Sequence, residues 1–98
     1  MEEDLFSLTK KVCDEETFLE FLYVLMKDRE KEVELEKKNP SSPYGAGALG
    51  WQNATIEDYL ESAIAWAEDS GQSNEFYSKP ENPWARVAQI LHAGKTYE

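Results

Sequence analysis

Hydrophobic residues recur at helical spacing in three segments of the chain, and the first segment covers residues 15–38. At about 100° per residue, its apolar positions fall on a single stripe that we expect to face the core. This stripe consists of Phe18, Phe21, Leu22, Leu25 and Met26. Asp14 or Glu15 can cap the free amides of the first turn, so we expect the helix to begin there.

Beyond Lys27 the apolar stripe ends, because charged residues occupy the side of the helix on which Phe18 and Leu22 lie. We expect residues 27–38 to form a solvated extension of the helix, supported by pairs such as Glu34 with Lys38. The alternative is that a partner or a second subunit covers this extension.

The clearest two-faced pattern lies in residues 56–70. Thr55 precedes it as a hydroxyl N-cap, and Asp58 follows three residues later, close to a capping box. One side of the predicted helix carries Glu57, Asp58, Glu61, Glu68 and Asp69. The opposite side carries Ile56, Tyr59, Leu60, Ala63, Ile64, Trp66 and Ala67.

A third helix is predicted over residues 83–96, since Asn82-Pro83 places an amide cap before a proline at the first helical position. A short helix over residues 4–11, with Leu5, Leu8 and Val12 turned inward, is expected before the first long one. In no segment do hydrophobic and polar residues alternate over several positions as they do in a half-buried strand. We therefore expect an all-α fold, a compact bundle of three main helices and one short N-terminal helix.

Two breaks separate the long helices, one at residues 39–50 and one at residues 70–82. The first contains two prolines and three glycines, which prevent a continuous helix. These glycines lack the Lys-Ser/Thr ending of a phosphate-binding loop and follow no strand, so we interpret them as a structural loop. With 98 residues and no internal repeat, the chain is expected to be a single helical domain, 1–98.

Composition narrows the possible partners. Twenty acidic residues against ten basic ones give a net charge of −10, which disfavours binding to nucleic acid or to an anionic membrane surface. The charge is also localised, because residues 51–78 contain six carboxylates and no lysine or arginine. A functional acidic patch is expected there.

The single cysteine, Cys13, favours a reducing compartment, and an acidic N-terminus without an apolar run is unlike a secretory signal. We therefore expect a cytoplasmic location, and we expect Cys13 to be a small buried side chain. One histidine and one cysteine cannot build a zinc site, so we expect no metal or cofactor. His92 lies at the margin of the apolar stripe of the last helix, and we expect its ring to pack there. No spacing of acidic residues singles out a catalytic pair of carboxylates, so we do not expect an enzyme.

Aromatic residues supply the remaining candidates for contacts. Trp66 and Trp84 lie on apolar helix faces and are expected in the core. Trp51 either packs over the following helix or stands exposed as a binding anchor. The loop pair Phe76-Tyr77, flanked by polar residues, is the best candidate for an exposed aromatic contact.

The chain resembles a family of small acidic bacterial proteins of unknown function in the pattern of its aromatic and packing residues. These positions are Trp51-Gln52-Asn53, Tyr59-Leu60-Glu61, Trp66, Pro83-Trp84, Leu91, Ala93, Tyr97 and Glu98. The resemblance covers residues 14–98 and implies a bacterial, cytoplasmic protein with a compact helical fold. It implies no activity, and the loop before Trp51 is an insertion relative to shorter members.

These observations favour a small protein-binding module that docks its acidic helix face against a basic protein, in the manner of an immunity protein, an antitoxin or a regulatory subunit. The candidate binding residues are Glu57, Asp58, Glu61, Glu68, Asp69, Trp51, Phe76 and Tyr77. The alternative is a homo-oligomeric structural domain without a catalytic role.

Overall fold

The computed structural model describes residues 4–40, 47–72 and 77–97, and this part of the chain contains four helices and no strand. The helices are α1 (Leu5–Thr9), α2 (Glu15–Lys38), α3 (Ile56–Asp69) and α4 (Pro83–Thr96). The expected all-α fold is confirmed, and the three long helices begin at the expected residues. The short helix ends at Thr9, two residues earlier than expected.

Local capping explains why the helices begin where they do. The Asp14 carboxylate accepts a hydrogen bond from the Thr17 amide at 2.9 Å, and the Thr17 hydroxyl accepts one from the Asp14 amide at 3.1 Å, which closes a capping box. The Thr17 amide also holds the pKa of Asp14 below its usual range. The Thr55 hydroxyl accepts from the amide of Asp58 at 3.1 Å, and the Asn82 side chain caps α4.

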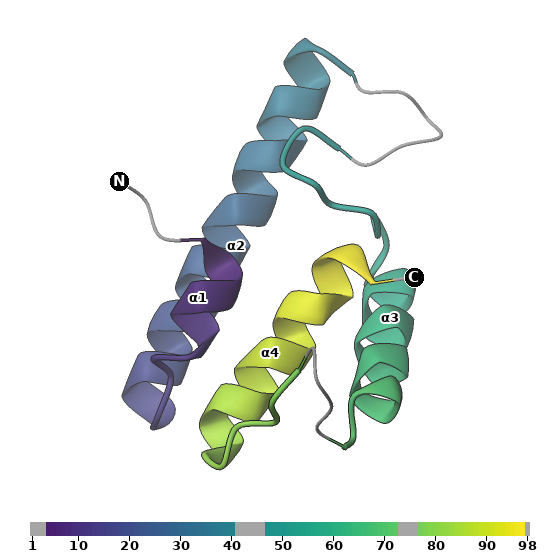
Figure 1. Ribbon diagram of the computed structural model, residues 1–98. Coiled ribbons are helices and arrows are strands. Elements are labelled where there is room, and N and C mark those ends of the chain that lie inside the picture. Colours follow the sequence, from purple (N-terminus) through teal and green to yellow (C-terminus); the bar gives the residue numbers. More distant parts are fainter. Residues whose placement is uncertain (1–3, 41–46, 73–76, 98) are drawn as a thin grey trace.

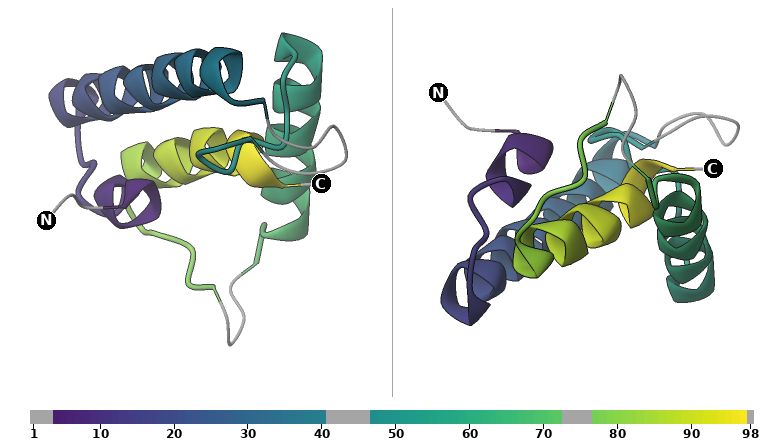
Figure 2. Two further views of the ribbon diagram at one scale, coloured as in Figure 1. Left: turned by 90° about the horizontal axis from the view of Figure 1, so that it is seen from above. Right: turned by 60° about the horizontal axis from the view of Figure 1, so that its bottom comes forward.

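Helix α4 lies in the middle of the molecule (Figure 1). It packs against α1 and α2 on one side and against α3 on the other, and the view from above shows α3 crossing the far end (Figure 2). Among the described helices, α3 contacts only α4. Much of the surface of α3 is therefore exposed to solvent.

The buried core is small and gathers around α4. It consists of Val12, Phe21, Leu25, Trp51 and Ala88. Burial of Phe21, Leu25 and Val12 confirms the expected inward faces. Two expectations are wrong: Met26 is exposed because its side of α2 points away from α1 and α4, and Cys13 is exposed in the turn before α2.

The two tryptophans on helix faces are half-buried and pack against other rings. Trp84 contacts Phe18 with ring centroids 5.5 Å apart, which joins α4 to α2. Trp66 contacts the Arg86 guanidinium, whose carbon lies 4.9 Å from the ring centroid, and this joins α3 to α4. Trp84 therefore packs against the core as expected, whereas Trp66 packs between α3 and α4 outside the core cluster, which corrects its expected place.

Candidate functional site

Trp51 is a packing residue. Its side chain is 8% exposed and stacks on Tyr59 of α3, with ring centroids 6.0 Å apart. The indole N–H donates a hydrogen bond to Oδ2 of Asp28 on α2 at 2.8 Å. Of the two roles considered for Trp51, the structure shows the one in which it packs over the following helix.

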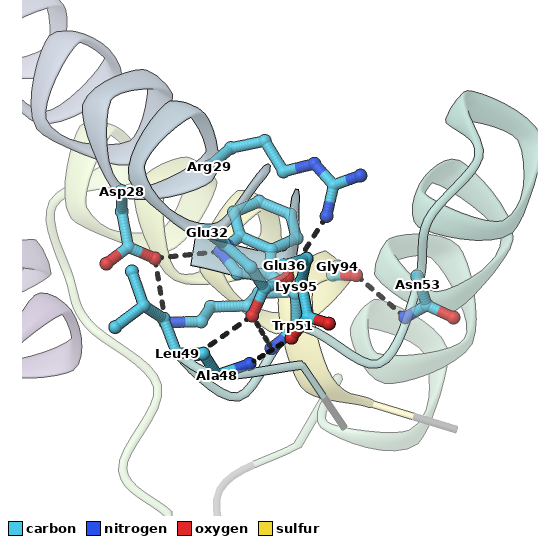
Figure 3. Close-up of polar contacts among 10 residues, drawn as sticks. All are labelled: Asp28, Arg29, Glu32, Glu36, Ala48, Leu49, Trp51, Asn53, Gly94 and Lys95. Carbon is cyan, nitrogen blue, oxygen red and sulfur yellow. Dashed lines mark hydrogen bonds and ion pairs between the residues drawn. The ribbon is translucent and has the colours of Figure 1, made fainter. Parts of the chain in front are cut away.

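The loop that carries Trp51 is fastened to α2 by two carboxylates, as Figure 3 shows. Glu32 is 2% exposed, and its Oε1 accepts from the amides of Leu49 at 2.9 Å and Trp51 at 3.2 Å. Arg29 pairs with the other oxygen of Glu32 at 3.1 Å. One turn further along, Glu36 accepts from the amide of Ala48 at 2.7 Å.

This arrangement corrects the expected solvated extension over residues 27–38, because residues 47–51 of the chain itself cover one side of it. Sequence reasoning missed Glu32. The available signal was the spacing of Asp28, Glu32 and Glu36, which places three carboxylates on one face of the helix. Gly47 lies so close to the Glu32 carboxylate that a β-carbon there would overlap it, which explains a glycine in this structural loop.

The same segment is also fixed to the C-terminal end of α4. The Gln52 amide donates to the carbonyl of Lys95 at 2.9 Å, and the Asn53 side chain donates to the carbonyl of Gly94 at 2.8 Å. The Lys95 ammonium pairs with Asp28 at 2.8 Å. The start of α3 is therefore held by side chains and backbone from both α2 and α4.

Tyr59 forms the main contact between α3 and α4. Its hydroxyl donates to the carbonyl of Leu91 at 2.6 Å, and burial raises the pKa of Tyr59 to about 12. Its ring lies against Gly94, where a β-carbon would come within 2.7 Å of the ring. This contact sets which side of α3 faces inward.

Tyr77 was expected to be exposed, and this expectation is wrong. The side chain is half-buried and packs edge-on against Trp66, with ring centroids 5.2 Å apart. Its hydroxyl donates to Gln89 at 2.6 Å and accepts from Arg86 at 3.1 Å. The second member of the expected pair, Phe76, lies outside the described residues.

The expected acidic face of α3 is present as an exposed surface. It consists of Glu57, Asp58, Glu61, Glu68 and Asp69. Asp69 accepts a hydrogen bond from the Tyr97 hydroxyl, which raises the pKa of Tyr97. The other four carboxylates form no ion pair and accept no hydrogen bond from the part of the chain that the structure describes.

Next to this acidic face lies an exposed apolar stripe, whose residues belong to the apolar side that the sequence pattern predicts for this helix. Ile56 is 76% exposed, Leu60 49% and Ile64 58%. These residues are four apart and so follow one another along one side of α3. They are exposed because, among the described helices, α3 packs only against α4, and it does so through the side that carries Tyr59, Ala63 and Trp66.

We call the combined surface the α3 outer face. It consists of the apolar stripe Ile56, Leu60 and Ile64 and the adjoining carboxylates Glu57, Glu61 and Glu68. Each of Glu57 and Glu61 directly follows a residue of the stripe, and Glu68 lies one turn beyond Ile64. An apolar strip bordered by unpaired negative charge can dock against a groove of complementary chemistry.

Other kinds of site find little support in the described segments. Nowhere in them do three His, Cys, Asp or Glu side chains come together as metal ligands would. None of the described helices has the length and the apolar character needed to cross a bilayer.

Comparison with known proteins gives a family and no activity. Neither the curated proteins nor the solved structures contain a significant match to this chain. The model of one family matches residues 14–98, which is most of the chain and includes α2, α3 and α4. The chain therefore belongs to the family of unknown function DUF7660.

Proposed function

We propose that the protein is a protein-binding module that docks the α3 outer face against a basic groove on a partner protein. The observation that supports this is the exposure of Ile56, Leu60 and Ile64 directly beside carboxylates that have no partner among the described residues. Contiguous apolar surface that is rimmed by polar residues commonly marks a protein-binding site. In this proposal the apolar stripe of α3 serves as the hydrophobic anchor, because Trp51 and Tyr77, which were candidates for that role, are packed against other residues.

The two halves of this face have different tasks. Unpaired carboxylates speed the encounter with a cationic surface and select against acidic surfaces, an effect that weakens as salt rises. The apolar stripe supplies affinity through the area that it removes from water. Both halves lie on a helix held at its N-terminal end by the loop contacts of Trp51, Gln52 and Asn53.

Charge reversal with a matched control tests the electrostatic half. The pair Glu57→Lys and Glu61→Lys changes two α3 carboxylates, one in the first turn and one four residues later. The pair Glu16→Lys and Glu20→Lys makes the same change at the equivalent positions of α2. We expect the α3 pair alone to abolish retention of a specific partner in affinity purification from the native cell extract, and equal retention by both pairs contradicts the proposal.

The apolar half is tested by Ile64→Ser, with Leu19→Ser on α2 as the control of similar exposure, 58% against 55%. We expect Ile64→Ser to weaken binding to the retained partner about tenfold, because burial of such a side chain is worth roughly 1.5–3 kcal/mol. Leu19→Ser should leave that affinity unchanged. If Leu19→Ser weakened binding and Ile64→Ser did not, the interface would lie on α2 and the proposal would be wrong.

One observation favours a homo-oligomeric structural domain as the second candidate. The outward side of α2 carries a further exposed apolar stripe, formed by Leu19, Tyr23, Met26 and Val33. Two copies could pair along it without bringing their acidic α3 faces together. Sedimentation over a range of concentrations tests this: a dimer abolished by Tyr23→Glu supports it, and a monomer at every concentration rules it out.

A further inference from the structure

A groove with a volume of about 750 Å³ opens between α1, α2 and α4, and α3 takes no part in it. Its apolar walls come from Leu5 and Leu8 of α1, Val24 of α2 and Leu49 of the loop. Three lysines border the same space, Lys27 and Lys31 from α2 and Lys95 from α4. Three lysines around one groove are unexpected in a chain with a net charge of −10.

Both negative groups at the groove are already occupied by protein donors. The two oxygens of Asp4 accept from the amide and the hydroxyl of Ser7, at 2.8 and 3.0 Å. One oxygen of Asp28 accepts from the Trp51 indole and also pairs with the Lys95 ammonium, each at 2.8 Å. Lys95 balances the charge of Asp28, whereas Asp4 keeps its negative charge, so the groove lining carries three ammonium groups against two carboxylates.

The positive groups are less well compensated. Lys31 is exposed and forms no ion pair with the described residues, whereas Lys27 pairs with the exposed Glu30 at 3.5 Å and its ammonium also lies 5.3 Å from the centroid of the Tyr23 ring. Because they are four residues apart, both ammonium groups can reach one anion at the mouth of the groove. Val24 lies one turn before Lys27, so this side of α2 changes from apolar to cationic along the groove.

His92 adds a further polar group to the groove wall. Its ring packs against Phe6, with centroids 5.8 Å apart, and its nitrogens hydrogen-bond to none of the described residues. Every fully buried side-chain nitrogen or oxygen in this part of the chain has a partner, so the imidazole nitrogens reach solvent in the groove. His92 bonds to neither aspartate, and we infer no acid–base chemistry here.

We propose that this groove binds a small organic carboxylate with an apolar body. The carboxylate lies between the ammonium groups of Lys27 and Lys31, and the apolar body lies along Leu5, Leu8 and Val24. Small-molecule sites commonly combine an apolar lining with a few polar groups that fix the orientation of the ligand. This site is independent of the α3 outer face, so either proposal can fail without the other.

Titration with hexanoate, followed by amide and methyl NMR, tests the site, and 1-hexanol serves as an uncharged probe whose apolar chain is one methylene longer. We expect saturable shifts at Leu8, Val24, Leu49 and His92, with a Kd on the order of 1 mM for so small a ligand. Hexanol should bind at least fivefold more weakly. The His92 ring should also titrate at a higher pH with hexanoate bound, because a carboxylate nearby favours the imidazolium form.

Two pairs of substitutions on α2 decide whether the lysines are responsible. Lys27→Gln with Lys31→Gln should weaken hexanoate about tenfold and leave hexanol unchanged. Lys37→Gln with Lys38→Gln removes the same charge from the far end of α2 and should change neither. Equal binding of the two probes, shifts that do not saturate, or equal effects of both lysine pairs would overturn the proposal.

Discussion

Glu32 shows how one side chain fixes the loop that positions α3. It is a buried carboxylate that receives two backbone amides and the Arg29 guanidinium. Charge-assisted hydrogen bonds of this kind are worth more than neutral ones, and loss of the acceptor leaves buried amides unpaired. The residue therefore matters for stability although it sits in a highly charged stretch of the helix.

We expect Glu32→Gln to lower the free energy of unfolding by about 1.5–3 kcal/mol, since the glutamine carbonyl can keep both amide bonds but its NH₂ group would face the Arg29 guanidinium, a donor that then lacks its acceptor. Urea denaturation measures this. Glu34→Gln is the control, because the one ion pair of Glu34 with a described residue is with the exposed Lys38, and its loss should cost less than about 0.5 kcal/mol. Similar losses for the two variants would contradict the assigned role of Glu32.

His92 gives a prediction on pH dependence. Burial lowers its pKa from 6.5, the Lys95 ammonium lowers it further, and Asp4 and Asp28 oppose both effects. The unfolded chain therefore binds the imidazole proton more readily than the folded chain does. The contribution of His92 to stability is fully present above pH 6.5 and is lost as the pH falls from 6.5 through the lowered folded pKa.

The titration of the His92 ring by NMR should have its midpoint below pH 6.5. As the pH falls from 6.5 through the lowered folded pKa of His92, the free energy of unfolding of the wild type should decrease more steeply than that of His92→Gln, which carries the same carboxylates without the imidazole. A midpoint above pH 6.5, or parallel stability curves for the two proteins, would contradict the burial of this ring.

At the scale of elements, the packing of α3 on α4 depends on the close approach of Tyr59 to Gly94. Gly94→Ala should destabilise the protein by about 1–3 kcal/mol through overpacking, despite the better helix propensity of alanine. In a Tyr59→Ala background, the same change should be neutral or stabilising because the ring is absent. A double-mutant cycle by thermal unfolding measures this coupling, and additive effects would contradict it.

The helices themselves could be predicted from sequence, because their signals are local. Asp14, Thr55 and Asn82 cap helices through bonds to residues two or three positions away, which a sequence displays directly. The inward positions of Phe21 and Leu25 follow from periodicity in the same way.

What the sequence could not provide are contacts between distant parts of the chain. Glu32 is buried by residues 17 and 19 positions away, and periodicity alone makes it a surface residue. The exposure of Ile56, Leu60 and Ile64 depends on how many helices pack against α3, which an amphipathic pattern does not state. The acidic side was located correctly because charged residues tend to be exposed in any arrangement of the helices.

At the scale of the whole molecule, the net charge of −10 is unevenly distributed. Cations and anions are interleaved along α2, and lysines border the groove beside α1. The carboxylates of α3 lie together on the opposite side of α4, where the views of Figures 1 and 2 place that helix. The molecule therefore presents an acidic and apolar surface on one side and a partly cationic groove on the other.

Photo-crosslinking in the native cell shows whether α3 is the surface that meets a partner. A photoreactive residue at Leu60 samples the α3 outer face, and one at Tyr23 samples the stripe on α2. We predict a crosslink from Leu60 to a basic protein, which disappears with Glu57→Lys and Glu61→Lys and persists with Glu16→Lys and Glu20→Lys. A crosslink from Tyr23 to a second copy of the chain, with none from Leu60, would contradict the account.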